Sequence, residues 1–374
     1  MKIALVHDDL IQKGGAEKVF LALHDIFPEA PIYTSVASDY WVKYCKGQKI
    51  DLRTSFLQKF PFSIELNRYY SPFLLHALAF ESFDFSEFDL VISSSARYAH
   101  GIITKPSTTH IAYINSPGRM FWEPNQYFEN EEYGVFKSLK FLARPFLAPF
   151  VGWLRAWDYV AAQRPDYVIA NSKTPQERIK KYYGREAEII YPFVDFDKFE
   201  VGEEALVEDK EKYFIIITRL APWKRVDIAV EACKELGVKL KIIGTGPDMG
   251  RLKALVEGAP VEFLGYASDT EKVRLLKGAL ALINTQIEDF GIVPLEAMAA
   301  GRPVLAYGKG GVLETVIPGS TGEFFHGQTK EALMETLKKF DPSKYNSDVC
   351  KKQAKKFDRI VFAAKIKDYV LRHW

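Results

Sequence analysis

The chain has 374 residues, which is more than one hydrophobic core usually supports, so we expect two domains. Its formal net charge is +2 and 26% of its residues are charged, which argues against a broad nucleic-acid-binding surface and leaves only local anion sites. The three cysteines, Cys45, Cys233 and Cys350, lie far apart, so they offer no zinc or disulfide framework and suit a reducing cytosol.

The first half of the chain alternates short β-branched runs with helical patterns, as in βαβ units that build a parallel sheet. The opening residues MKIALVHDDL have too short an apolar run for a signal peptide and predict the first buried strand. A helix follows at 16–27, with Val19, Phe20 and Leu23 on one face. The strands expected in this half are residues 3–7, 32–35, 90–93, 110–114, 167–170 and 188–191.

Residues 136–157, FKSLKFLARPFLAPFVGWLRAW, are rich in aromatic and basic side chains. They admit two interpretations: a surface that touches a membrane from the side, or a buried helical hairpin broken at Pro145 and Pro149. No apolar run in the chain approaches the roughly 18 residues of a spanning helix. We therefore expect a cytoplasmic protein that could lie at the inner face of the plasma membrane.

The segment at 192–212 is acidic and lacks periodicity, which predicts a linker, and a new alternation of strands and helices follows it. An amphipathic helix is expected in the tail at 351–374. We place the domains at 1–195 and 196–354, with a helix at 355–374 completing the first. The strands expected in the second half are residues 213–218, 239–244, 261–265, 280–284 and 302–307.

The predicted fold class is α/β, with two Rossmann-like, doubly wound parallel sheets that face each other across a cleft. In such sheets ligands bind outside the carboxyl ends of the strands, so the loops after the strands are the places to search. Gly14 and Gly15 open the first helix, where glycine lets the backbone approach a phosphate and the helix N-terminus favours negative charge. Strand-to-helix turns use such glycines without a ligand as well.

Three cations, Arg219, Lys224 and Arg225, converge where one strand ends and the next helix begins. Cations at a helix N-terminus oppose its dipole, so they predict an anion held between them. The later loop KIIGTGPDMGRL looks like a dinucleotide fingerprint but has Met249 where the third glycine belongs, so we expect it only to turn the chain.

The stretch EDFGIVPLEAMAAGRPV, residues 288–304, places Glu288 on a loop and Glu296 about one turn into a helix at 293–300. Backbone amides near Gly291 would point to the cleft, beside a carboxylate that can accept two hydrogen bonds from vicinal ribose hydroxyls. An anion-binding helix end next to such a carboxylate suggests a sugar nucleotide as the ligand.

Several of these motifs together resemble the retaining glycosyltransferases of family four. The motifs are GGAE after the first strand, R-L-x-x-x-K from Arg219, and E-x-F-G-x-x-P-x-E-A-M-A-x-G-x-P-V followed by GG-x-x-E. The resemblance spans nearly the whole chain and is greatest for mannosyltransferase-like enzymes of bacterial surface polysaccharide and O-antigen assembly. It implies the GT-B architecture, with an acceptor-side N-terminal domain and a C-terminal domain that binds the nucleotide sugar.

The resemblance also implies roles for individual residues. Glu288 would contact hydroxyls of the transferred sugar, and Glu296 would bind the ribose of the nucleotide. Arg219 and Lys224 would hold the donor diphosphate, and Gly15 would close on it. The other residues implied in nucleotide-sugar binding are Gly14, Asp289, Phe290, Gly291, Ile292 and Val293.

The stretch IAYINSPGRMFWE, 111–123, resembles the family pattern Y-x-H-T-P-x-R-x-x-W-D, but Asn115 stands where most relatives have histidine. Asparagine can donate a hydrogen bond to the donor sugar, yet it cannot carry a proton. Arg119 and Trp122 match the pattern, either as part of the acceptor or donor-sugar side or as a packing pair between the domains. In SSSARYAHG, Ala96 replaces another histidine that the family commonly has.

These features favour transfer of a hexose, with GDP-mannose as the expected donor, to a saccharide or polyprenol-linked acceptor with retention of configuration. The resemblance implies a front-face displacement in which the leaving phosphate takes the acceptor proton. No cofactor and no metal is expected, because the triplet Asp195-Phe196-Asp197 lies in the linker, away from the nucleotide loops. The alternatives are a GT-B epimerase that needs no acceptor, and a non-catalytic sugar-nucleotide-binding subunit, which Asn115 favours.

Overall fold

The computed structural model describes residues 1–67, 74–123, 140–200 and 212–374, and for 140–148 it describes the backbone alone. The chain divides into two compact units. Unit 1 consists of the described residues up to Tyr191 together with Phe362–Trp374, and unit 2 consists of the described residues of Pro192–Val361. The chain therefore crosses from one unit to the other after Tyr191 and again after Val361.

Unit 1 is built on a parallel sheet of seven strands in the order β3-β2-β1-β4-β5-β6-β7. The strands are β1 Ile3–His7, β2 Ile32–Thr34, β3 Leu52–Thr54, β4 Leu90–Ser95, β5 Thr109–Ile114, β6 Tyr167–Ala170 and β7 Glu188–Ile189. Central strands such as β4 are buried along their whole length, as expected for a sheet covered on both faces. The edge strand β3 was not predicted, because it is only half-buried and carries a single apolar residue, Leu52.

The helices of unit 1 are α1 Gly15–Ile26, α2 Asp39–Gly47, α4 Leu75–Glu81, α5 Arg119–Trp122, α7 Lys140–Ala161, α8 Lys173–Tyr183 and α17 Arg359–His373, with short 3-10 turns η1 Phe56–Lys59 and η3 Ala99–Gly101. α7 runs past Pro145 and Pro149 as one helix, so the interpretation of this segment as a broken hairpin is wrong. Residues 136–139 of the expected membrane-contact segment lie outside the described residues. Within the described ranges, no helix has the length and apolar character needed to span a bilayer.

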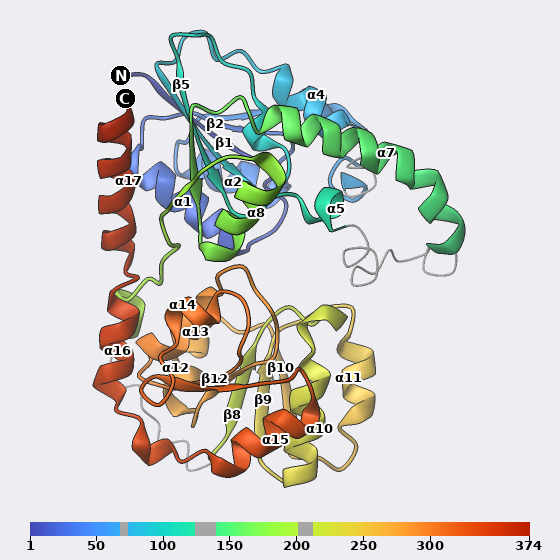
Figure 1. Ribbon diagram of the computed structural model, residues 1–374, viewed down its shortest axis with the longest axis vertical. Helices are drawn as coiled ribbons and strands as arrows, with labels where there is room; N and C mark the ends of the chain where they lie inside the picture. Colours follow the sequence, from blue (N-terminus) through green and yellow to red (C-terminus); the bar gives the residue numbers. More distant parts are fainter. Residues whose placement is uncertain (68–73, 124–139, 201–211) are drawn as a thin grey trace. The chain divides into compact units, whose positions relative to one another are not determined.

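The C-terminal helix α17 starts in unit 2 and packs against unit 1, where it runs beside the sheet (Figure 1). The hydroxyl of Tyr369 donates to the carbonyl oxygen of Val168 at 3.5 Å, and Arg372 pairs with Glu188 at 2.9 Å. The tail is two helices rather than one, because the segment between α16 Ser347–Lys355 and α17 pairs with Val194, whose N–H donates to the Phe357 carbonyl oxygen at 2.9 Å.

Unit 2 is built on a parallel sheet of six strands in the order β10-β9-β8-β11-β12-β13. The strands are β8 Phe214–Ile217, β9 Leu240–Ile243, β10 Val261–Gly265, β11 Leu282–Asn284, β12 Val304–Tyr307 and β13 Gly322–Phe325. The edge strand β13 was not predicted, since it begins with a glycine and two of its four residues are only half-buried. The expected linker contains a short helix, and its residues 201–211 lie outside the described residues.

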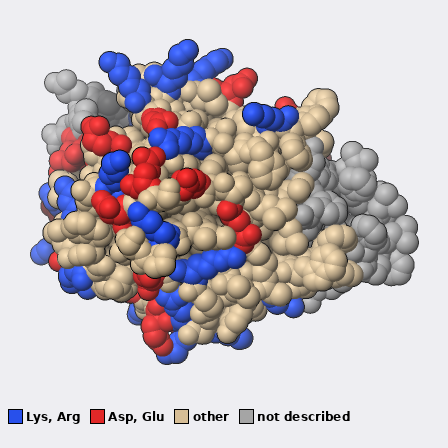
Figure 2. Space-filling view, turned by 90° about the horizontal axis from the view of Figure 1, so that it is seen from above, with Lys and Arg blue, Asp and Glu red and all other residues tan. Residues whose placement is uncertain are grey.

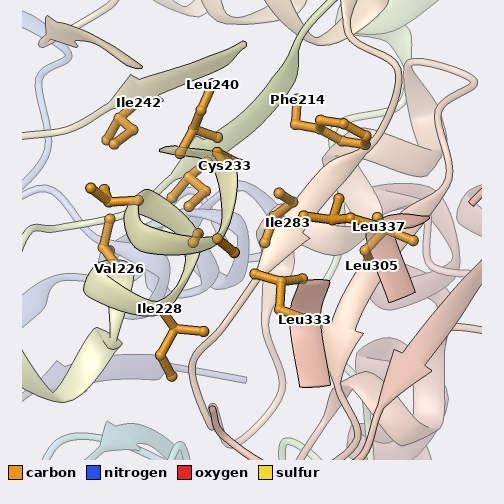
Figure 3. Packing of buried hydrophobic residues seen from close by; sticks show 14 of the residues in the cluster. Phe214, Val226, Ile228, Cys233, Leu240, Ile242, Ile283, Leu305, Leu333 and Leu337 are labelled. Atoms are coloured by element: carbon orange, nitrogen blue, oxygen red, sulfur yellow. The ribbon is translucent and has the colours of Figure 1, made fainter. Parts of the chain in front are cut away.

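Helices cover both faces of this second sheet (Figure 1). On one face α10 packs on α11 and α15, and on the other α13 packs on α12, α14 and α16. The core beneath α10 and α15 is aliphatic: Cys233 and Leu333 from these helices meet Ile242, Ile283 and Leu305 from the strands (Figure 3). The remaining elements are η6 Pro222–Lys224, α9 Asp197–Glu200, α10 Val226–Leu236, α11 Met249–Leu255, α12 Asp269–Gly278, α13 Ile292–Ala299, α14 Val312–Thr315, α15 Lys330–Lys339 and η7 Pro342–Lys344.

In each sheet the strand order reverses once, between β1 and β4 in unit 1 and between β8 and β11 in unit 2. At such a switch point the loops leave in opposite directions and open a crevice at the carboxyl ends of the strands. The loops after these four strands are therefore the first places to look for a site. On the face shown in Figure 2, cationic and anionic side chains are interleaved and do not gather by sign.

Candidate functional site

The switch point of unit 2 carries an ion pair between two residues that the sequence singled out. Lys224 lies in η6, shortly after β8, and Glu288 lies in the loop after β11. The Nζ of Lys224 is 2.5 Å from Oε1 of Glu288, and it also lies 4.0 Å from the centre of the Trp223 ring. The Lys224 side chain is 9% exposed and that of Glu288 22% exposed. The pair is thus mostly withdrawn from water but open to it on the carboxylate side.

The backbone around Lys224 fixes this pair in place. The hydroxyl of Thr285, just after β11, donates to the carbonyl oxygen of Lys224 at 2.8 Å, which ties the two loops of the switch point together. Arg225 adopts a left-handed conformation, with φ of 51°, and caps α10. Its guanidinium turns to Asp227, 3.3 Å away. Of the three cations expected to converge, the structure therefore brings Lys224 to Glu288, turns Arg225 aside, and leaves the Arg219 side chain exposed at the end of β8.

The loop from Glu288 into α13 depends on close glycine packing. Gly291 has φ of 87° and precedes the first residue of α13, Ile292. The N–H of Gly311 donates to the Glu288 carbonyl oxygen at 2.9 Å, and a Cβ on Gly311 would lie 2.2 Å from the carbonyl oxygen of Phe290. The GG pair is thus needed to bring the neighbouring loop against the Glu288 loop. The first-turn amides of α13 lack intrahelical acceptors, as at every helix start, and Asp289, Ile292 and Val293 are half-buried beside them.

Glu296 lies in the second turn of α13 and is held by a residue that sequence reasoning missed. Its Oε1 is 2.8 Å from Nζ of Lys272 in α12, and its side chain is 6% exposed. A carboxylate so far from water needs a cation or several donors. That requirement was a usable signal, but the identity of the partner depends on how α12 packs on α13. The two glutamates therefore hold different lysines.

Gly14 and Gly15 lie exposed at the start of α1 in unit 1. The Gly14 N–H donates to the carboxylate of Glu17 at 2.8 Å, so one of the free amides of this helix start is already used. Burial raises the pKa of Glu17, and the charge of His7 opposes that shift only in part. Sequence reasoning missed Glu17, although a Glu three residues after a helix cap is a known capping pattern.

Asn115 and Arg119 follow β5 in unit 1. The Asn115 amide Nδ2 donates to Oγ of Ser94 at 3.1 Å, which leaves its side-chain carbonyl oxygen for another donor. Arg119 is the first residue of α5 and is half-buried. Trp122 donates to Asp158 at 2.6 Å and stacks on Tyr182 at 4.8 Å, so these contacts are packing within unit 1 and not between domains.

A second carboxylate that the sequence analysis missed, that of Asp8, lies at the switch point of unit 1. Asp8 follows β1 and is fully buried, and it accepts the backbone N–H groups of Ala96, Arg97, Tyr98 and Ala99 at 2.6 to 2.9 Å. Burial alone would raise its pKa, but the charges of Arg97 and His7 and these amides outweigh burial and hold the pKa below its usual value. The pair Asp8-Asp9 directly after the first strand was the available signal.

The loop GTGP after β9 needs no ligand to explain its glycines. A Cβ on Gly244 would lie 1.8 Å from the carbonyl oxygen of Thr218, and one on Gly246 would lie 2.1 Å from that of Leu220. Both glycines allow this loop to pass directly over the loop after β8. The D-x-D triplet is likewise occupied, because Asp195 lies 3.4 Å from Lys198 and 3.8 Å from Arg359. Across the described residues, no group of three or more His, Cys, Asp or Glu side chains is arranged to hold a metal ion.

Residues 197–357, almost all of unit 2, match the family described as Glycosyl transferases group 1. Unit 2 is therefore similar to the domain that defines this glycosyltransferase family. The chain is 30% identical over 194 residues, 45% of its own length and 51% of the relative's, to GDP-mannose-dependent alpha-(1-6)-phosphatidylinositol monomannoside mannosyltransferase of Mycolicibacterium smegmatis. It is 28% identical over 268 residues, 62% of its length and 63% of the relative's, to mouse alpha-1,3/1,6-mannosyltransferase ALG2. The chain thus spans less than two thirds of the curated relatives it matches.

The whole chain also resembles a solved structure, that of Anabaena Alr3699/HepE in complex with UDP. The two chains align over their full lengths with a TM-score of 0.71 at 17% identity, which is evidence for the fold. With a parallel Rossmann-like sheet in each unit and this full-length structural match, the predicted GT-B fold class is confirmed.

Proposed function

We propose that the protein is a retaining glycosyltransferase that moves a hexose, with mannose as the first candidate, from a nucleoside diphosphate sugar to a saccharide or lipid-linked hydroxyl in surface polysaccharide synthesis. The observation that carries this is the Lys224–Glu288 pair at the switch point of a group 1 glycosyltransferase domain. The names of the two mannosyltransferase relatives support mannose, and the name of the mycobacterial relative supports a guanosine diphosphate donor.

In this proposal the donor lies along the carboxyl edge of the unit 2 sheet. Glu296, whose Oε1 is held by Lys272, accepts hydrogen bonds from the ribose hydroxyls. The diphosphate is held by Lys224, by the exposed Arg219 and by the first-turn amides of α13, where the helix dipole favours an anion. The residues proposed to line the donor are Gly14, Gly15, Arg219, Lys224, Asp289, Phe290, Gly291, Ile292, Val293 and Glu296.

The chemical step makes use of a cation already in place. As the bond from the anomeric carbon to the diphosphate oxygen breaks, negative charge grows on that phosphate, and Lys224 stabilises it. The acceptor oxygen bonds to the anomeric carbon from the same face, and its proton passes to the leaving phosphate. Glu288 orients Lys224 through its Oε1 and offers Oε2 to sugar hydroxyls. No metal ion or other cofactor is part of the proposal, because the side chains named here supply the positive charge.

The acceptor side belongs to unit 1, where we assign Asn115 and Arg119. Asn115 keeps a free carbonyl oxygen that can accept from a sugar hydroxyl, but it cannot shuttle a proton. That property also favours a second candidate, a non-catalytic sugar-nucleotide-binding subunit. A cytoplasmic location with peripheral membrane contact through 136–157 completes the proposal.

The test combines binding and turnover in the purified full chain without metal. We expect GDP-mannose or another nucleoside diphosphate sugar to raise Tm, and GDP release from the donor to be measurable with water or a membrane extract as acceptor. Glu288→Gln should keep nucleotide binding and lose at least about 100-fold in donor turnover, since a charge-orienting group at the breaking bond is removed. Glu323→Gln is the matched control, because Glu323 accepts from Tyr345 in the same unit, remote in sequence from the nucleotide loops.

Two results would overturn the proposal. Parental turnover in Glu288→Gln would remove this residue from the reaction. Binding of a nucleotide sugar without any turnover in the parent protein, across donors and extracts, would favour the non-catalytic subunit.

A further inference from the structure

A chain of alternating charges runs through unit 2 from Glu296 to the places where the polypeptide crosses between the units. Lys272 lies 2.8 Å from Glu296 and 3.8 Å from Asp269. Asp269 lies 2.7 Å from Lys198, which is 3.4 Å from Asp195. Each interior member therefore has two partners of opposite charge.

This chain of charges is desolvated at both ends and exposed in the middle, since the Asp195 side chain at the far end is only 14% exposed. The Glu296 side chain is 6% exposed and that of Lys272 17%, whereas Asp269 is 60% and Lys198 46% exposed. Exposed pairs taken alone contribute little because water and salt screen them. Their weight here comes from competition, since Lys272 can move between Glu296 and Asp269. Whatever neutralises Asp269 keeps Lys272 on Glu296.

We infer that Lys198 and Asp269 are positioning residues for nucleotide binding. Lys198 neutralises Asp269, so that Lys272 stays bound to Glu296 and this carboxylate keeps one orientation toward the ribose hydroxyls. The inference rests on the proposed function, in which Glu296 binds the ribose. Neither positioning residue touches the nucleotide, and both act through Lys272.

The far end of the chain gives the Asp195-Phe196-Asp197 triplet a role other than metal binding. Asp195 lies just after the first crossing between the units, and Arg359, 3.8 Å from it, lies just before the second. Lys198 binds both Asp195 and Asp269. Lys198, which we infer to position Glu296 through Asp269 and Lys272, is thus also bound to a residue next to the first crossing.

Because positive and negative charges alternate along these side chains, removing neighbouring charges is expected to change nucleotide affinity in opposite directions. Removing Lys198 takes one positive charge away from Asp269, which then draws Lys272 away from Glu296 and weakens nucleotide binding. Removing the charge of Asp269 takes away the competitor, so binding is not weakened. In the double variant residue 269 carries no charge that could draw Lys272 away, so the loss of Lys198 has no effect and affinity returns to the parental value. A merely structural role would give two losses that add.

The experiment is calorimetric titration of the full chain with GDP and with UDP at low ionic strength. For Lys198→Ala we expect Kd to rise about two- to fivefold, the range of an exposed ion-pair contribution. Asp269→Asn and the double variant should bind at least as tightly as the parent. The difference should vanish at about 1 M salt, where the screening length is about 3 Å. Lys330→Ala is the control, because Lys330 makes a similarly exposed 2.7 Å pair with Glu235.

Glu296→Gln separates failure of the inference from failure of the proposed function. If Glu296→Gln weakens nucleotide binding while Lys198→Ala does not, or if the double variant stays as weak as Lys198→Ala, the positioning role is wrong and the donor site stands. If the parent binds neither nucleotide, or if Glu296→Gln binds as the parent does, the ribose assignment and the inference fall together.

Discussion

The two units place a carboxylate at the same topological position and use it in opposite ways. Asp8 lies at the switch point of unit 1, where its carboxylate accepts hydrogen bonds from four backbone N–H groups. Glu288 lies at the switch point of unit 2, where its carboxylate pairs with Lys224 and stays partly exposed to water. A carboxylate enclosed by backbone amides cannot exchange them for a ligand, whereas one held by a lysine side chain can.

The surroundings of the two carboxylates differ in the same sense. Beside its carboxyl edge unit 1 buries His76, which stacks on Tyr98 at 5.3 Å, and toward the start of β5 it buries His110, which is 2.8 Å from Ser93. Unit 2 lines its edge with lysine–glutamate pairs and closely packed glycines. The fold therefore encloses the switch-point carboxylate of unit 1 and leaves that of unit 2 available for binding.

The largest expected effect comes from neutralising the enclosed carboxylate. Asp8→Asn should lower the free energy of unfolding by about 3 to 5 kcal/mol, because a donor NH₂ group replaces an acceptor opposite buried N–H groups. Glu288→Gln, the same change at the other switch point, should cost less, about 1 to 2 kcal/mol, because the amide oxygen can still accept from Lys224 and the side chain is partly exposed. Urea unfolding of both variants measures this difference, and equal losses would refute the contrast between a locked and an exchangeable carboxylate.

An intermediate effect is expected from the glycines of the two units. Gly246→Ala should destabilise unit 2 by roughly 1 to 3 kcal/mol, because the new Cβ would overlap the Leu220 backbone. Gly14→Ala should cost less than about 1 kcal/mol, since its Cβ would meet only the movable end of Glu17. Hydrogen exchange of peptides from each unit locates the loss. Gly250→Ala, with open space around its Cβ, is the neutral control.

The smallest expected effect, counted per pH unit, is a loss of folding stability at low pH that is confined to unit 1. Burial lowers the pKa of His76 to about 4 and that of His110 to about 3. Both are neutral in the folded chain, whereas the unfolded chain takes up protons below about pH 6.5, so stability falls as the pH falls from there toward 4. Each histidine contributes at most about 1.4 kcal/mol per pH unit. Glu17 works in the opposite direction, because its raised pKa eases protonation of the fold.

Fluorescence-detected urea unfolding of Trp223→Phe measures this slope, since the other tryptophans all belong to unit 1. His110→Gln should reduce it. Unit 2 has one histidine, His326. If hydrogen exchange shows that the stability of both units changes equally with pH, the assignment of this effect to the buried histidines of unit 1 is contradicted.

Most of the fold was accessible from the sequence because buried parallel strands leave an apolar signature. The central strands and α1 were placed within a few residues. The edge strands β3 and β13 were missed, since a half-buried strand of three or four residues has no such signature. The break between α16 and α17 was missed for a different reason: it is set by pairing with Val194, far away along the chain.

The site was less accessible, because side-chain partners depend on packing. Lys224 and Glu288 were both singled out from loops after strands, and the structure brings them together. The sequence analysis did not find Lys272, Glu17 and Asp8, although each of them pairs with a charged group or a backbone N–H that needs a partner. Arg225 was expected to point at the same anion as Lys224, but its left-handed backbone turns it to Asp227.

The helix α17 has a consequence for how the protein is made. Because Phe362–Trp374 belong to unit 1 and follow unit 2 in the chain, unit 1 cannot be completed during synthesis until all of unit 2 has left the ribosome. Domains usually fold in the order in which they emerge. Here unit 2 can fold first although it starts second, while β6 and β7 wait for the helix that covers them. A chain that ends at residue 361 would therefore contain all of unit 2 and a unit 1 that lacks the helix against β6 and β7.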